Sequence, residues 1–205
     1  MRASQTPAPP DMAGFPLPSR ALARSELQRD ACYEKIPPQD CGRILEAAWS
    51  KGEGAAARIF EQYGGETSLC RVAAHSGLGC RWDERDYAPA GRRRFAEYLP
   101  HQGCVQLYRG SIRLLAQENG IPEERALNLV LGHEYFHFLE HTSLGWTSRD
   151  YLVPMLQLGP LRLGKTGIRA LSEVGAHAFA CTYCLLGDGR AAAGPGLLPG
   201  QDFIR

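Results

Sequence analysis

The sequence has no run of about eighteen apolar residues, the length that a membrane-spanning helix requires. It also has no excess of either charge, since 23 Lys and Arg residues stand against 22 Asp and Glu residues, for a formal net charge of +1. Domains that bind nucleic acid usually carry a basic excess. We therefore expect neither a membrane nor a nucleic acid among the partners of this chain.

Paired cysteine motifs are missing as well. The chain has seven cysteines, an odd number, and one C-x-x-C motif, which is formed by Cys181 and Cys184. A zinc ribbon needs a second such pair. Residues 1–20 contain five prolines and no continuous apolar stretch of the kind that a secretory signal has. These features predict a cytoplasmic protein with reduced thiols, in which Cys181 and Cys184 pack on a helix.

No internal repeat is present, and a length of 205 residues suits one domain with a small extension. Composition divides the chain into four segments. Residues 1–20 are rich in proline and predict a disordered leader, while residues 187–205, rich in Gly, Ala and Pro, predict a flexible tail. Between them we expect a helical N-terminal extension over residues 21–65 and the main domain over residues 66–186.

The main domain is predicted to be α+β, mostly helical with a small three-stranded antiparallel sheet. Two alternating apolar segments separated by PHQG favour a hairpin, and apolar residues at helical spacing indicate the helices. The last two helices are joined by a connection that is too long for a bare loop. Strands are expected at 78–82, 95–99 and 104–108, helices at 68–75, 111–119, 122–141 and 168–186, and the connection at 142–167.

The stretch GHEYFHFLEH contains two overlapping metalloprotease motifs. His133 and His137 lie four residues apart and therefore share one face of a helix, where they can bind one metal, with Glu134 beside it as a base for water. In the inverted motif, His137 and His141 bind the metal and Glu140 is the base. Helical spacing alone does not decide between the two motifs.

A third ligand favours the first motif, because a catalytic zinc usually has three protein ligands and one open position. Glu173 is the only glutamate after His141 and lies on a predicted helix that can pack against the motif helix. His177 lies one turn after Glu173, on the same face. It is a candidate for orienting a ligand, for stabilising a developing oxyanion, or for replacing Glu173 as the third ligand.

The H-E-x-x-H motif followed by a glutamate on a later helix is similar to the gluzincin class of zinc peptidases. More narrowly, residues 68–186 resemble the ImmA/IrrE-type metallopeptidases in the order of their elements, which ends in the E-x-x-A-x-x-F-A sequence that begins at Glu173. Two departures stand out. His177 occupies a position that usually holds a small polar residue in such proteins, and residues 1–65 contain no evident helix-turn-helix domain.

The resemblance implies a zincin-like fold and a Zn²⁺ ion bound by His133, His137 and Glu173. It also implies that Glu134 is the general base and that the substrate is a protein or peptide. Within this interpretation, Glu134 and His177 are the predicted catalytic residues. The alternatives are a catalytically silent, metal-stabilised regulatory or interaction protein, and a metal-free domain whose His and Glu residues form a polar network.

Further roles follow from the same interpretation. Tyr108, Arg149 and Tyr151 are candidates for stabilising a tetrahedral intermediate, and the sequence does not choose among them. The strand at 105–107 is expected to offer an edge to an extended peptide by strand addition.

Overall fold

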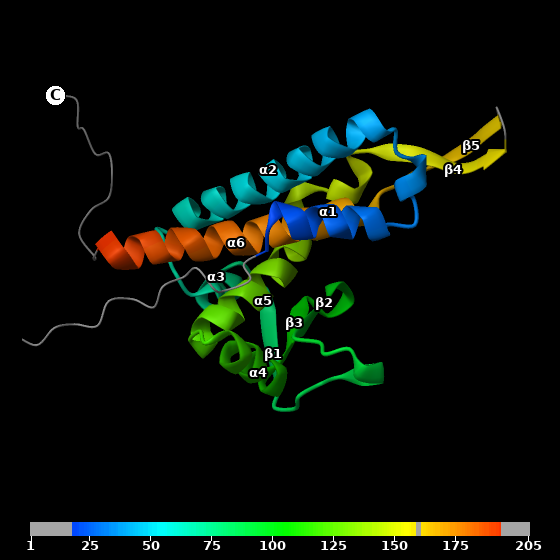
Figure 1. The fold of residues 1–205 in the computed structure, drawn as a ribbon. Coiled ribbons are helices and arrows are strands. Elements are labelled where there is room, and N and C mark those ends of the chain that lie inside the picture. Colours follow the sequence, from blue (N-terminus) through cyan, green and yellow to red (C-terminus); the bar gives the residue numbers. More distant parts are fainter. Residues whose placement is uncertain (1–17, 159–160, 194–205) are drawn as a thin grey trace, which may run out of the picture.

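The computed structural model describes residues 18–158 and 161–193 (Figure 1). The fold is α+β, mostly helical with small sheets. No helix within the described ranges is long and apolar enough to cross a membrane. In chain order the main elements are α1 (Arg20–Arg29), α2 (Pro38–Gln62), α3 (Leu69–His75), β1 (Gly79–Asp83), β2 (Ala96–Leu99), β3 (Cys104–Tyr108), α4 (Arg109–Asn119), α5 (Glu123–Leu139), β4 (Leu152–Leu158), β5 (Leu161–Gly167) and α6 (Arg169–Ala193).

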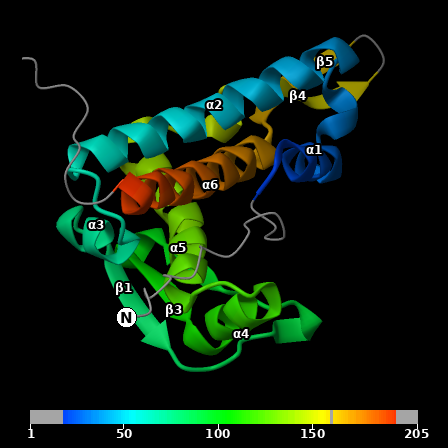
Figure 2. The ribbon, with the colours of Figure 1, turned by 60° about the vertical axis from the view of Figure 1, so that its left-hand side comes forward.

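The two longest helices, α2 and α6, lie side by side and form one layer of the molecule (Figures 1 and 2). Gly52 of α2 allows this close packing, because a Cβ atom there would overlap the carbonyl oxygen of Gly175 and would lie 2.8 Å from the Cβ of Ala178. Helix α1 and the N-terminal half of α2 bury one apolar cluster against α6, with Trp49 and Ile168 among its members. This layer fixes the position of the first turns of α6.

Helix α5 crosses beneath α6 and separates it from the sheet (Figure 2). Pro122 precedes α5, and Glu123 and Glu124 lie in its first turn, where acidic side chains interact favourably with the helix dipole. Because α5 has neighbours on several sides, it buries residues around most of its circumference, which include Leu131, Tyr135, Phe136 and Leu139.

The first sheet is mixed, so the predicted all-antiparallel sheet is wrong in one pairing. Strands β2 and β3 form the expected antiparallel hairpin, with Tyr98 opposite Val105. Strand β1 pairs with the other side of β3 in parallel, with Cys80 opposite Val105, and the strand order is β1-β3-β2. The connection from β1 to β2, residues 84–95, passes the end of β3, and Ser111 anchors it through bonds to Asp86 and to the backbone N–H of Tyr87.

The connection expected at 142–167 contains regular structure. A π-helical turn over Glu140–Leu144 continues α5, a 3-10 turn follows at Thr147–Arg149, and β4 and β5 then form a separate two-stranded antiparallel sheet. The alternation of apolar and polar residues is too weak in LVPMLQL and LRLGKTG to indicate these strands. The hairpin returns the chain directly to the start of α6.

The chain ends differ from expectation where they are described. Ser19 caps α1 by accepting a hydrogen bond from the backbone N–H of Leu22, so Arg20, placed in the disordered leader, begins a helix. Helix α6 continues past the expected end at 186 to Ala193. On α6, Cys184 is buried and Cys181 half-buried, and both thiols are free. The rest of the predicted leader and tail lies outside the described residues.

Candidate metal centre

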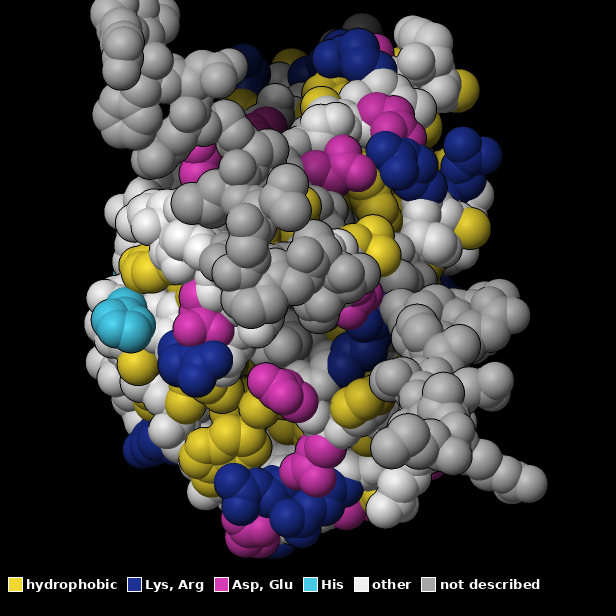
Figure 3. Space-filling model, turned by 90° about the vertical axis from the view of Figure 1, so that its left-hand side faces the viewer, with side chains coloured by type: hydrophobic (Ala, Val, Ile, Leu, Met, Phe, Trp, Pro, Cys, Tyr) yellow, Lys and Arg dark blue, Asp and Glu magenta, His cyan; other side chains and the backbone are white. Residues whose placement is uncertain are grey.

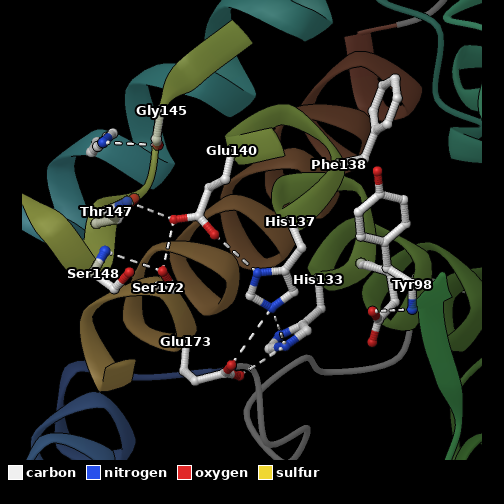
Figure 4. Close-up of polar contacts among 12 residues, drawn as sticks. Tyr98, His133, His137, Phe138, Glu140, Gly145, Thr147, Ser148, Ser172 and Glu173 are labelled. Carbon is white, nitrogen blue, oxygen red and sulfur yellow. Dashed lines mark hydrogen bonds and ion pairs between the residues drawn. The ribbon is translucent and has the colours of Figure 1, made fainter. Parts of the chain in front are cut away.

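Three side chains from two helices meet at one point of the molecule (Figure 4). His133 and His137 project from adjacent turns of α5, and Glu173 projects from the second turn of α6. The two Nε2 atoms of the histidines are 3.3 Å apart, and the Glu173 carboxylate oxygens lie 3.1 Å from His133 Nε2 and 3.6 Å from His137 Nε2. All three ligand atoms lie within 4.8 Å of one another, which is a spacing that can hold one metal ion.

Two glycines bring the helices close enough for these side chains to meet. Gly132 precedes His133, and a Cβ atom there would lie 3.1 Å from the Cα of Ala180 on α6. Gly175 follows Glu173 by two residues, and a Cβ atom there would lie 2.5 Å from Cζ of the buried Phe136. Glycine in a helix interior lowers helix stability by about 1 kcal/mol relative to alanine, so packing rather than propensity accounts for both residues.

Glu140 is a buried carboxylate that orients His137. Its side chain is 0% exposed, and its Oε2 lies 3.1 Å from His137 Nδ1 (Figure 4). Its Oε1 accepts hydrogen bonds of 2.8 Å from the backbone N–H of Thr147 and from the hydroxyl of Ser172. A proton on Nδ1 of His137 directs the lone pair of Nε2 towards the cluster, which is the arrangement that a metal requires.

The pKa of Glu140 reflects the same network. Burial alone raises the pKa of this carboxyl, but the hydrogen bonds from His137, Thr147 and Ser172 lower it below its ordinary value. Glu140 is therefore ionised although it is buried, and all of its described contacts are with hydrogen-bond donors.

These contacts favour the H-E-x-x-H motif over the inverted one. In the inverted motif Glu140 would be the base and His141 a ligand. Glu140 faces inward onto His137, Thr147 and Ser172, so it is not placed to contact a reacting water. His141 is exposed, and its ring lies 6.3 Å from that of Tyr98 and 6.0 Å from that of Trp146, outside the three-residue cluster.

Glu134 is attached to the sheet rather than to the cluster. Its Oε2 accepts a hydrogen bond of 2.8 Å from the backbone N–H of Tyr98 in β2, which leaves Oε1 without a described protein donor. Strand β2 is an edge strand, because only β3 pairs with it in the described part of the chain. The expectation that the strand at 105–107 offers an edge is wrong, since β3 is the central strand and is paired on both sides.

The charged groups of the cluster shift one another's pKa values, and burial shifts them as well. Burial alone raises the pKa of Glu173, but the hydrogen bond with His133 and the charges of the nearby histidines lower it to about 2. Burial alone lowers the pKa of His133, but the neighbouring carboxylates, Glu173 first among them, raise it above its ordinary value. Burial and, next to it, the charge of His133 lower the pKa of His177 to about 4. Glu173 is therefore an anion and His177 a neutral imidazole.

Two cavities meet at His133 and Glu134, which line both. One, of about 350 Å³, is also lined by the other two cluster residues and by Tyr98, Pro100 and Trp146. The second, of about 410 Å³, is mostly apolar. Its walls include Phe95, Leu115, Leu129, Val130, His177 and Ala180.

The remaining predicted site residues are spread more widely. His177 lines the apolar cavity, with its ring 5.0 Å from that of His133, and is not part of the three-residue cluster. Tyr108 stacks on Tyr87, Tyr151 donates a hydrogen bond to Asp40, and Arg149 is exposed. None of Tyr108, Tyr151 and Arg149 lines either cavity, so the structure does not bring them to the site.

Sequence reasoning missed the residues that support the cluster. Glu140 follows His137 by three residues, a spacing that predicts a side-chain contact on a helix, so the sequence does carry this signal. No local pattern connects Thr147 or Ser172 to His137, since the contacts depend on how the chain folds back between α5 and α6. The same is true of the backbone N–H of Tyr98.

Comparison with protein-family models, with curated proteins and with solved structures finds no match for this chain. The resemblance to the ImmA/IrrE-type metallopeptidases therefore depends on the motif residues and the order of the elements alone.

Proposed function

We propose that this chain is a zinc-dependent metallopeptidase that hydrolyses a peptide bond in a protein or peptide substrate. The observation that carries the proposal is the convergence of His133, His137 and Glu173 within 4.8 Å, with Glu134 on the wall of the adjoining cavity. Two histidines and one glutamate are a ligand set of catalytic zinc sites that leave one position open. The proposal includes a zincin-like fold and membership of the gluzincin class.

The donor chemistry supports a resident metal ion. The two imidazole Nε2 atoms lie 3.3 Å apart, beside the carboxylate of Glu173. Without a metal cation, only a shared proton could link these two nitrogens. The buried Glu140 adds the outer carboxylate that metal-bound histidines usually have, and it acts on His137 through Nδ1. His133, His137 and Glu173 are the residues that would hold the ion.

Zinc held in this way supplies a Lewis acid that polarises a carbonyl group and lowers the pKa of water to about 7. In the proposed mechanism Glu134 moves the proton. The Tyr98 N–H fixes one oxygen of its carboxylate, so the other is free to accept a proton from the attacking water and to pass it to the leaving amine. The buried aromatic rings of Tyr135 and Phe136 pack behind the motif and keep bulk water from its inner side.

The surroundings of the cluster support a polypeptide substrate. The edge of β2 borders the cavity at Tyr98, and an edge strand can pair with an extended peptide through backbone hydrogen bonds. A peptide in that position would lie beside Glu134. The chemistry of the cluster alone does not require a polypeptide, so the substrate class depends on this edge.

The proposal is tested by metal content and by turnover together. The purified chain should contain about one zinc ion. His137→Ala and Glu173→Ala should lose it, whereas His141→Ala, a histidine of the same segment outside the cluster, should retain it. Glu134→Gln should keep the metal and remove cleavage of a peptide library analysed by mass spectrometry. Glutamine retains an oxygen that can accept the Tyr98 N–H but cannot act as a base.

The outcomes separate this proposal from its alternatives. Zinc in the wild type with no cleavage of any library peptide would favour a metal-stabilised interaction protein. Absence of zinc after reconstitution would leave a polar network of His and Glu. Cleavage that persists in Glu134→Gln would contradict the proposed base.

A further inference from the structure

The two strands β4 and β5, residues 152–158 and 161–167, are together called the ribbon here. It extends away from the helical layer (Figure 1), and within the described residues its two strands pair with each other and with no third strand. Its root is fixed, because Val153 is 2% exposed and Lys35 Nζ donates a hydrogen bond of 2.7 Å to the carbonyl oxygen of Met155. An isolated two-stranded ribbon is only marginally stable in water. The question is therefore what stabilises the outer half of this ribbon.

The ribbon exposes large apolar side chains on both faces. The pairs Leu152 with Gly167 and Leu156 with Leu163 lie on one face. Leu161 belongs to that face as well, and the leucines there are each about half exposed. Met155 lies on the opposite face and is 61% exposed. Of the nine exposed large hydrophobic residues described, five belong to the ribbon: Leu152, Met155, Leu156, Leu161 and Leu163.

The ribbon also carries charge of one sign only. From residue 151 to residue 172 the sequence contains no acidic residue, but it contains Arg162, Lys165 and Arg169. Arg162 and Lys165 are exposed on β5. Elsewhere the charges are mixed, as on the face in Figure 3, where Lys and Arg side chains are interspersed with Asp and Glu. An apolar surface that carries exposed cations is complementary to a surface that is both apolar and anionic.

We propose that the ribbon docks on an anionic lipid bilayer, with its outer apolar side chains in the interface and its cations at the lipid phosphates. A flat protein surface covers one face of a ribbon, whereas a bilayer can contact both faces, and Met155 is exposed opposite to the leucines. From Met155 to Leu158, the last residue of β4, the ribbon is about 10 Å long at ~3.3 Å per residue. Interfacial apolar segments reach a similar depth.

A second copy of the chain is a poorer partner. Packing two ribbons face to face would bring Arg162 and Lys165 of both copies together without an acidic residue in either ribbon. The expectation of no membrane partner rests on the missing long apolar run, and a ribbon tip does not require such a run. The proposal is independent of the metal centre, so either can fail without the other.

The test is co-sedimentation of the full chain with vesicles of phosphatidylcholine alone and of phosphatidylcholine mixed with phosphatidylglycerol. The wild type should bind only the anionic vesicles, and added salt should weaken binding. Met155→Ser with Leu156→Ser and Leu161→Ser should weaken it by about 100-fold. Arg162→Gln with Lys165→Gln should weaken it by roughly 30-fold.

The matched control is Leu185→Ser on α6, because Leu185 is 49% exposed and Leu156 is 48% exposed. It should bind the anionic vesicles as the wild type does. Three results would overturn the proposal. They are a wild type that stays in the supernatant with anionic vesicles, an equal loss in Leu185→Ser, and a wild-type dimer that does not bind vesicles and that the triple substitution dissociates.

Discussion

The junction of α5 and α6 and the ribbon are neighbours along the chain but differ in how tightly their residues are constrained. At the junction, a Cβ atom at Gly132 or at Gly175 would lie within 3.1 Å of an atom of the facing helix, and Glu140 is fully enclosed. In the ribbon, which leads into α6, Met155 is 61% exposed and Leu156 is 48% exposed. Substitutions should therefore affect folding and metal binding at the junction and surface properties in the ribbon.

Removal of the metal should have the largest effect on stability. A ligand that binds only the folded chain stabilises it by about 4 kcal/mol when its concentration is 1,000 times its Kd. Adding a chelator should therefore lower the melting temperature of the wild type, and added zinc should restore it. In His137→Ala, chelator and zinc should both leave the melting temperature unchanged. A zinc-dependent shift of equal size in that variant would place the metal elsewhere.

Gly175→Ala should produce the next largest effect. The new methyl group would lie 2.5 Å from the ring of Phe136, which is fully buried, so we expect a loss of about 1–3 kcal/mol in the free energy of unfolding. Zinc affinity should fall with it, because the substitution separates the helices that carry the ligands. Chemical denaturation and zinc titration measure the two effects.

The matched control for Gly175 is Gly42→Ala on α2, because a Cβ atom at Gly42 would meet no atom within 4 Å. Alanine is a better helix former than glycine by about 1 kcal/mol, so this variant should be at least as stable as the wild type. Equal destabilisation in both variants would contradict the argument from close packing.

The sequence alone predicts part of the metal centre and part of the fold. The helical spacing of His133 and His137, and the position of Glu173 on a later helix, predict which three side chains come together. Local pattern also predicts the β2–β3 hairpin and most helix boundaries. It does not predict the parallel partner of β3, because strand order depends on contacts between segments distant in sequence.

The sequence does not predict the ribbon or the hydrogen bonds that hold Glu140, for a related reason. The strands of the ribbon lack a buried partner and so lack the regular alternation that burial imposes. The hydrogen bonds that Thr147 and Ser172 donate to Glu140 come from the segments on either side of the ribbon, and only the folded chain brings them together. Packing and polar networks are tertiary properties, whereas motif spacing is local.

Glu140→Gln should weaken zinc binding by about 10- to 100-fold, the usual effect of removing a carboxylate that orients a metal-bound histidine. The amide oxygen of glutamine can still accept hydrogen bonds from Thr147 and Ser172. The amide nitrogen cannot accept a hydrogen bond from His137 Nδ1. The substitution therefore isolates the contact with His137. Competition with a chromophoric chelator measures the affinity.

Ser172→Ala is the control for Glu140, since it removes one donor to the carboxylate and leaves the His137 contact in place. Its effect on zinc affinity should be smaller than that of Glu140→Gln. If Ser172→Ala weakened zinc binding as much, the role of Glu140 would be to hold the loop rather than the histidine.

Leu156→Ser should have the smallest effect on stability, within about 0.5 kcal/mol of the wild type, because exposed positions without special contacts tolerate substitution. Val153→Ser, in the same strand, should cost roughly 2 kcal/mol, because Val153 is buried in the cluster that α1, α2 and α6 form. Denaturation of the two variants measures this difference. If Leu156→Ser cost as much as Val153→Ser, the outer half of the ribbon would contribute to the fold, and its apolar side chains would need no partner outside the chain.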